Sequence, residues 1–74
     1  MNELERVVLT TDLPDHHLLV GDVGTVVLVH EGGRGYEVEF VALSGETVAV
    51  VSVTSDQVRR VRKGEIAHVR AVEA

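Results

Sequence analysis

The chain has 74 residues, carries 12 acidic against 7 basic side chains, and has a formal net charge of −5. This length suits one small domain, and the absence of cysteine excludes both disulfides and thiolate metal sites. The acidic balance repels phosphate backbones and therefore argues against broad electrostatic binding of nucleic acid.

Valine dominates the composition and predicts short β-strands, because its branched side chain packs well on a pleated surface. Residues 6–10 are expected as the first strand, and residues 11–20 as an irregular loop, because Pro14 cannot donate a backbone hydrogen bond to a sheet. Gly24 precedes the second strand, residues 25–30, and indicates either a positive φ or the close approach of another backbone. The nearly continuous apolar character of this strand predicts burial on most of both sides.

A glycine-rich reversal at residues 31–35, with Arg34 at its tip, predicts a hairpin into a third strand, residues 36–41. This strand alternates, so that one set of side chains is expected in the core and the other set outside. The set expected in the core is Tyr36, Val38 and Phe40. The outward set is the acidic pair Glu37 and Glu39, which we expect to keep that face solvated.

The second half of the chain continues the pattern of strands and tight turns. A turn at residues 42–46 leads to a strand at residues 47–53, and the polar residues 54–57 are long enough for one 3-10 turn. Residues 58–61 return to strand character. Residues 65–72 fit a sixth strand, a short helix or a docked tail, of which we favour the strand. Five or six short strands without an amphipathic helix predict an all-β fold, a small closed or half-open barrel.

Four motifs carry a resemblance to a known family. They are Asp12-Leu13-Pro14, Gly21-Asp22-Val23-Gly24-Thr25-Val26-Val27, Tyr36-Glu37-Val38-Glu39-Phe40 and Asp56-Gln57-Val58. Their order looks like an SH3-like barrel and resembles, over about residues 4 to 62, a family of small prokaryotic proteins catalogued as a domain of unknown function. The resemblance implies a single SH3-like domain over residues 1–74, with its core at about 4–62 and a C-terminal extension at 63–74.

The resemblance also bears on function. Proteins of that family are often encoded beside a small protein thought to be a toxin, which implies an antitoxin or immunity role. The segment from Gly21 to Val27 is also similar to the KOW-type element of ribosomal and transcription-factor barrels. This chain departs from KOW-type domains because it is acidic and lacks their basic loops.

We therefore expect a non-catalytic protein-binding module whose partner is a protein, such as a basic toxin steered by charge. The expected surfaces are the loop at residues 12–19, the acidic face of the third strand, and an exposed edge strand. The candidate partner-binding residues are Asp12, Asp15, His16, His17, Glu37 and Glu39. Self-association through an edge strand is an alternative.

A second alternative is a nucleic-acid module that uses the basic C-terminal cluster. The residues expected to contact phosphates in that case are Arg59, Arg60, Arg62 and Lys63, with Arg70. Such binding would weaken linearly with the logarithm of salt concentration. The competing interpretation is a solvated edge strand that is protected by its charges.

Catalytic and metal-binding patterns are weak. His16 and His17 lie near two aspartates, but adjacent histidines on an extended chain point to opposite sides, and a site would need His30 or His68 as well. No serine is placed beside a base by the sequence pattern. We therefore expect no metal, no cofactor and no enzymatic activity. Residues 1–9 lack the features of a secretory signal, and no apolar run approaches the about 20 residues that span a bilayer, so we expect a cytoplasmic protein.

Overall fold

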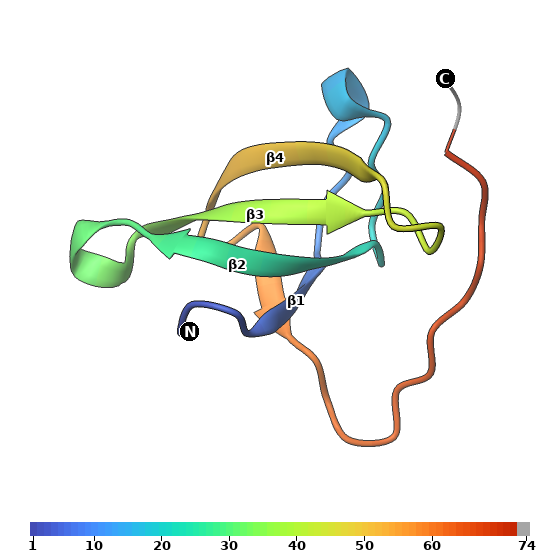
Figure 1. Cartoon of the computed structure of the whole chain (residues 1–74). Helices are drawn as coiled ribbons and strands as arrows, with labels where there is room; N and C mark the ends of the chain where they lie inside the picture. The colour runs from blue at the N-terminus through green and yellow to red at the C-terminus, as the bar shows by residue number, and fades with distance from the viewer. Residues whose placement is uncertain (73–74) are drawn as a thin grey trace.

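Five antiparallel strands form one sheet in the computed structural model, which describes residues 1–72 (Figure 1). The strands are β1 (Arg6–Leu9), β2 (Val23–Val29), β3 (Gly35–Val41), β4 (Thr47–Thr54) and β5 (Val58–Arg60). Their order in the sheet is β4-β3-β2-β1-β5. The predicted all-β class with antiparallel strands is confirmed. The sheet curls strongly, but β4 and β5 remain its two edges, so it is not closed into a barrel.

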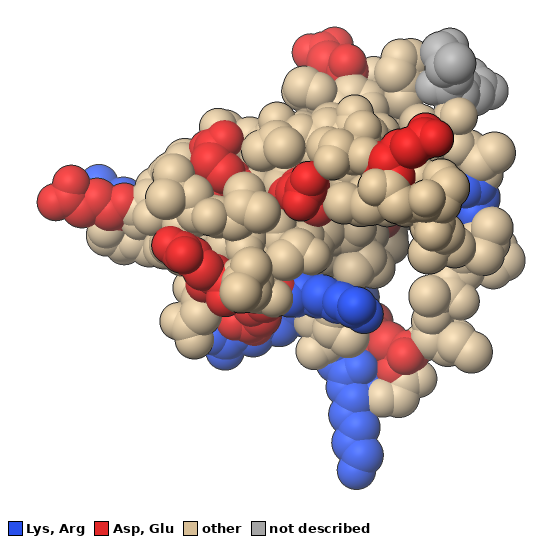
Figure 2. Space-filling view, in the orientation of Figure 1, with Lys and Arg blue, Asp and Glu red and all other residues tan. Residues whose placement is uncertain are grey.

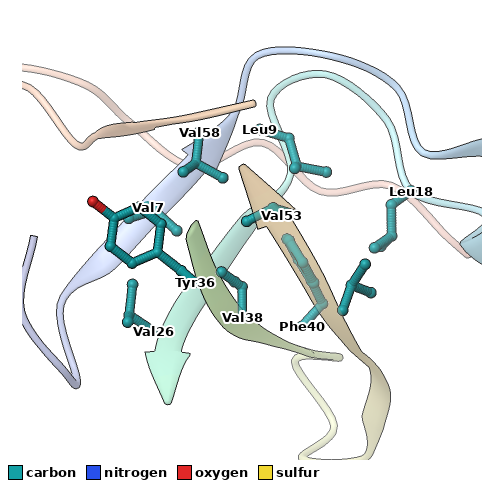
Figure 3. Packing of buried hydrophobic residues seen from close by; sticks show 10 residues of the cluster. Val7, Leu9, Leu18, Val26, Tyr36, Val38, Phe40, Val53 and Val58 are labelled. Carbon is teal, nitrogen blue, oxygen red and sulfur yellow. The ribbon is translucent and has the colours of Figure 1, made fainter. Parts of the chain in front are cut away.

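The hydrophobic core lies on the inner side of this curl and is almost entirely aliphatic. Its buried members come from every strand and from the loop before β2, and their side chains point toward one another (Figure 3). They are Val7, Leu9, Leu18, Val26, Tyr36, Val38, Phe40, Val51, Val53 and Val58. The three core residues predicted in β3 are confirmed, because strict alternation left one register for that strand.

The prediction that the second strand is buried on both sides is wrong, and a β-bulge is the reason. Val26 pairs with Val38, but the next pair joins Leu28 to Glu37, so Val27 is an extra residue without a partner in the ladder. Val26 is fully buried, whereas the side chains of Val27 and Leu28 are exposed. The continuous run of apolar residues therefore belongs to a bulged strand, β2, that buries only one of its two faces.

Short helical turns occur at positions other than the expected one. Two 3-10 turns form, η1 (Pro14–His16) and η2 (Glu31–Gly33), whereas residues 54–57 make a simple hydrogen-bonded turn. Proline favours η1 because its φ is already helical, and η2 requires positive φ values at Gly32 and Gly33. No helix among residues 1–72 has the length and apolarity needed to cross a membrane.

The loop before β2 is more ordered than its sequence indicates. Leu13 and Leu18 exchange two backbone hydrogen bonds across η1, with N···O distances of 2.9 and 3.2 Å. This small bridge turns the side chain of Leu18 into the core, where it is 2% exposed. The sequence pattern indicated an irregular loop at Leu18 and did not place this residue in the core.

The prediction of a sixth strand at residues 65–72 is wrong. After β5 the chain leaves the sheet, turns at Gly64, where φ is +84°, and then returns along the side of the molecule (Figure 1). We refer to residues 61–72 as the tail. Within the described part of the chain, the only backbone–backbone hydrogen bond in the tail joins Glu65 to Arg62. The tail is extended, but no strand pairs with it.

Position 24 requires glycine because strand β3 lies very close to it, and not because of its φ, which is not positive. A Cβ atom at this position would lie 2.5 Å from Cγ1 of Val38, 2.9 Å from Cε1 of Phe40 and 3.0 Å from the carbonyl oxygen of Glu39. The neighbouring strand β3 therefore lies against the bare backbone of β2. Of the two reasons predicted for this glycine, the close approach is the correct one.

Phe40 is the only phenylalanine in the chain and is 3% exposed in the core. Substitution Phe40→Ala should lower the free energy of unfolding by about 3–5 kcal/mol, because it removes buried area and leaves a cavity. Urea denaturation followed by circular dichroism measures this loss. The control Val50→Thr, on the exposed face of β4, should change it by less than about 0.5 kcal/mol. An unchanged urea midpoint for Phe40→Ala would contradict the assignment of the core.

Candidate functional site

The outer face of the sheet, opposite the core, carries an apolar stripe. In the strand ladder Val8 of β1 lies between Arg59 of β5 and Val23 of β2. Val8 is only 6% exposed even though it points away from the core, while Val23 and Val41 of the same face remain about half exposed. A partly covered apolar surface on the solvent side of a sheet is a feature that marks interaction sites.

A groove lies between this outer face and the tail, with a volume of about 1260 Å³. Its floor is the apolar stripe of Val8, Val23 and Val41, and its opposite wall is the tail from Glu65 to Val72. The turn between β3 and β4 closes one end. Figure 2 shows an opening between the tail and the body of the domain, so the groove is accessible from more than one side.

The tail is attached to the sheet at two points, and the first is an ion pair between Arg59 and Glu65. Arg59 donates from Nη1 and Nη2 to the two carboxylate oxygens of Glu65 at 2.9 and 2.6 Å. The backbone N–H of Arg62 donates to the same carboxylate. The hydrogen bonds from Arg59, and next those from the Arg62 backbone, lower the pKa of Glu65 to about 2.

The second attachment joins Arg70 to Asp22, immediately before β2. Arg70 donates from Nε to Oδ1 of Asp22 at 2.9 Å and from Nη2 to Oδ2, and the same Nη2 donates to the carbonyl of His17 at 3.1 Å. Asp22 also accepts the backbone N–H of Leu19 at 2.8 Å. Burial alone would raise the pKa of Asp22, but the hydrogen bonds from Arg70 and Leu19 outweigh it, so the pKa is lowered.

Between these two attachments the tail forms an arch over β1, which we define as residues 65–70. The five residue steps from Glu65 to Arg70 can span about 17 Å when extended. Arg59 and Val23 are two strand spacings apart, since both pair with Val8, which corresponds to about 10 Å. Because the chain is longer than the distance it bridges, it bows outward. The opening beside the tail in Figure 2 follows from this geometry.

Two carboxylates, Glu39 and Glu46, lie at the edge of the groove near the turn between β3 and β4. Glu39 accepts a hydrogen bond from Oγ1 of Thr47 at 2.8 Å. Neither carboxylate forms a salt bridge with any residue in the range 1–72. They give this end of the groove a negative charge. Arg6, which also lines the groove and forms no salt bridge within residues 1–72, lies two strands away, because Arg6 pairs with Thr25 and Thr25 with Glu39.

The other predicted acidic residue of β3, Glu37, lies outside the groove and is already engaged. Its Oε2 is 2.6 Å from Nε2 of His30 and also accepts a hydrogen bond from the hydroxyl of Ser52. These contacts, first that with Ser52 and then that with His30, lower the pKa of Glu37. The carboxylate lies between the serine and the histidine, so the histidine cannot act as a base toward the hydroxyl.

The loop residues predicted to bind a partner are exposed but lie away from the groove. Asp12 accepts the backbone N–H of Val20 at 2.8 Å, which shapes the loop. Asp15 and His16 lie on the exposed turn η1, and His17 follows it with φ of +59°. His17 contributes its carbonyl to Arg70 and lines a small pocket beside the tail. The structure therefore does not bring these loop residues together with Glu37 and Glu39.

The basic cluster near the C-terminal end is partly neutralised by acidic neighbours. Arg59 pairs with Glu65, and Nε of Arg60 lies 2.8 Å from Oε2 of Glu5. Arg62 and Lys63 are exposed at the start of the tail. The four residues do not form one continuous cationic surface. Figure 2 shows basic side chains mainly along the lower edge of the visible face, with acidic side chains beside them.

Neither a metal site nor a buried polar site is present in the described part of the chain. Within residues 1–72, no three histidine, aspartate or glutamate side chains are grouped so that they could hold a metal ion. No polar or charged residue in that range is buried. What the geometry offers is an apolar surface with a charged edge, and this chemistry suits binding.

The groove residues were largely missed by sequence analysis. Arg70 was assigned to a phosphate-binding set and Val8 and Val41 to separate strands, and the sequence pattern did not bring Asp22 or Val23 together with them. The available signal was the pair of opposite charges at residues 22 and 70, but 48 positions separate them and only the fold brings them together.

A comparison with known families confirms part of the predicted resemblance. The model of a family described as a domain of unknown function (DUF4926) matches residues 3–60, which include all five strands. No curated protein and no solved structure is similar enough to this chain to match it. The matched segment ends where the tail begins, so the arch lies outside it.

The attachment of the tail should depend on pH because the pKa of Glu65 is lowered from its ordinary value of 4.5 to about 2. A carboxylate whose pKa is lower in the folded chain contributes its full stability above the unfolded pKa and loses it as the pH falls through the folded pKa. We therefore expect the pair with Arg59 to weaken between about pH 4.5 and pH 2. Heteronuclear NOE values of the amides in the arch should fall over this range.

The substitution Glu65→Gln should produce the same increase in mobility at neutral pH, because it removes the charge at the first attachment. The matched control is Glu46→Gln, which removes a charge that pairs with no described residue and should leave the arch unchanged. An arch that stays equally ordered in Glu65→Gln would show that the ion pair does not hold it.

Proposed function

This chain belongs to the family described as a domain of unknown function (DUF4926), and that family assigns no role. From the surface of the molecule we propose that it is a non-catalytic protein-binding module. The observation that carries this proposal is the groove under the tail. Its apolar floor lies on the solvent side of the sheet, and its edge bears two carboxylates without ionic partners in residues 1–72. Interfaces combine an apolar centre with a charged edge in this way.

The charges support a basic protein partner. The chain carries a net charge of −5, and its arginines at positions 59, 60 and 70 are already paired with acids. The acidic residues left without a pair, Glu39 and Glu46 among them, would attract a cationic partner and guide its approach. The same pairing weakens the nucleic-acid alternative, because Arg59 and Arg60 would have to leave a carboxylate to reach a phosphate.

The groove can be tested with the product of the adjacent gene, which the family resemblance implies as the partner. Tagged chain and neighbouring protein are co-expressed and purified together at low salt. Val23→Glu places a charge on the floor of the groove and should abolish co-purification. Val50→Glu introduces the same charge outside the groove, on a valine of β4 that is 54% exposed against 44% for Val23, and should retain the partner. Retention by both variants, or no co-purification with the wild-type chain, would contradict the proposal.

We also propose a more specific role as an antitoxin or immunity protein. Its support is the family resemblance together with the acidic surface, which would neutralise a basic toxin by covering it. Expression of the neighbouring protein alone should then arrest growth, and the wild-type chain should restore it. Val23→Glu should fail to restore growth, while Val50→Glu should succeed. Normal growth with the neighbouring protein alone would remove the antitoxin role and leave the binding role standing.

A further inference from the structure

The arch has unused hydrogen-bonding capacity. Residues 66–69 belong to no helix or strand and follow the open path seen in Figure 1, and none of their backbone N–H or C=O groups forms a hydrogen bond with another residue in the range 1–72. Ile66 and Val69 are 93% and 72% exposed. An extended segment with free backbone groups and exposed aliphatic side chains has the properties of an unpaired edge strand.

The floor and the far edge of the groove also have apolar and charged groups that no residue of the chain fully covers. Its floor presents Val23 and Val41, each about half exposed, and its far edge presents Glu39 and Glu46. An occupant would have to supply three things: backbone groups for the arch, aliphatic side chains for the floor, and a positive charge for the edge. An extended peptide meets the first requirement, whereas a helix does not, because its backbone groups are satisfied internally.

We propose that the arch and the outer face of the sheet form a clamp for an extended peptide segment of the partner protein. The peptide pairs as a strand with residues 66–69, places alternate aliphatic side chains on the floor, and directs a lysine or arginine toward Glu39 and Glu46. This inference rests on the proposed function and specifies the partner as an extended, basic, aliphatic segment.

The two attachments of the arch explain how such a peptide would enter. Each attachment is a two-point pair of one arginine and one carboxylate, and the pair with Asp22 is partly buried and accompanied by the bond from Arg70 to the carbonyl of His17. None of these four charged residues belongs to the hydrophobic core, so either attachment can open without disturbing it. The second attachment, between Arg70 and Asp22, lies at the C-terminal end of the arch. Its release would let residues 66–70 swing about the remaining attachment at Glu65 and close again over a bound peptide.

A labelled ten-residue peptide of alternating valine and lysine is the probe, and its binding is followed by fluorescence anisotropy. Its control is the same peptide N-methylated at alternate residues, which keeps the charge but removes the backbone donors of one edge. We expect the N-methylated peptide to bind at least tenfold more weakly. Equal binding of the two peptides would show attraction by charge alone and would overturn the clamp.

The chain offers a matched pair of variants at Ala67. Ala67→Pro removes a backbone donor of the arch, and Ala67→Ser keeps it, and neither touches the core or an attachment. Ala67→Pro should lose at least tenfold in affinity for the peptide, and Ala67→Ser should change it by less than threefold. In the wild-type chain the amides of residues 66–69 should become protected from exchange when the peptide is bound.

Three outcomes would overturn the proposal. The first is that Ala67→Pro binds the peptide as the wild-type chain does. The second is that no peptide binding is detected at all. The third is a dimer in light scattering that Ala67→Pro dissociates, which would identify a second copy as the occupant. If the neighbouring protein co-purifies with Ala67→Pro but not with Val23→Glu, the binding function stands and only the clamp fails.

Discussion

The ion pair between Arg70 and Asp22 is the interaction on which the surface of this molecule depends. Without it the tail would have one attachment, and the groove would lose its outer wall. Asp22 can hold the tail because its carboxylate accepts three hydrogen bonds, two from Arg70 and one from the backbone of Leu19. This ion pair joins the turn before β2 to the tail, so a residue in the first half of the sequence fixes the position of the C-terminal segment.

Because the sheet is open, its outer face has apolar side chains that the tail can cover. A closed barrel has no edges, whereas here β4 and β5 end the sheet on either side, and the outer face keeps a stripe of half-exposed valines. The charges of Arg59 and Arg60 on β5 discourage another strand from adding there. The arch covers part of the stripe and leaves the rest accessible, and this partial cover turns a plain sheet face into a groove.

The strands could be predicted from the sequence because local patterns determine them. Alternation in β3 identified Tyr36, Val38 and Phe40, and the glycine-rich reversal identified the hairpin before it. The bulge at Val27 could not be predicted, because a run of valines and a leucine offers no mark for the extra residue. Residues 65–72 were assigned to a strand because their composition favours one, and only the three-dimensional path shows that no strand pairs with them. The groove depends on contacts between residues far apart in the sequence, which local patterns do not report.

The missing side chain of Gly24 links two strands through one shared volume. Phe40 and Val38 occupy the space that a Cβ at position 24 would need. The backbone oxygen of Glu39 lies in the same volume, so a smaller side chain at position 40 alone would not make room for a Cβ at position 24. The glycine therefore sets how closely β2 and β3 approach, and a side chain there would have to push the two strands apart.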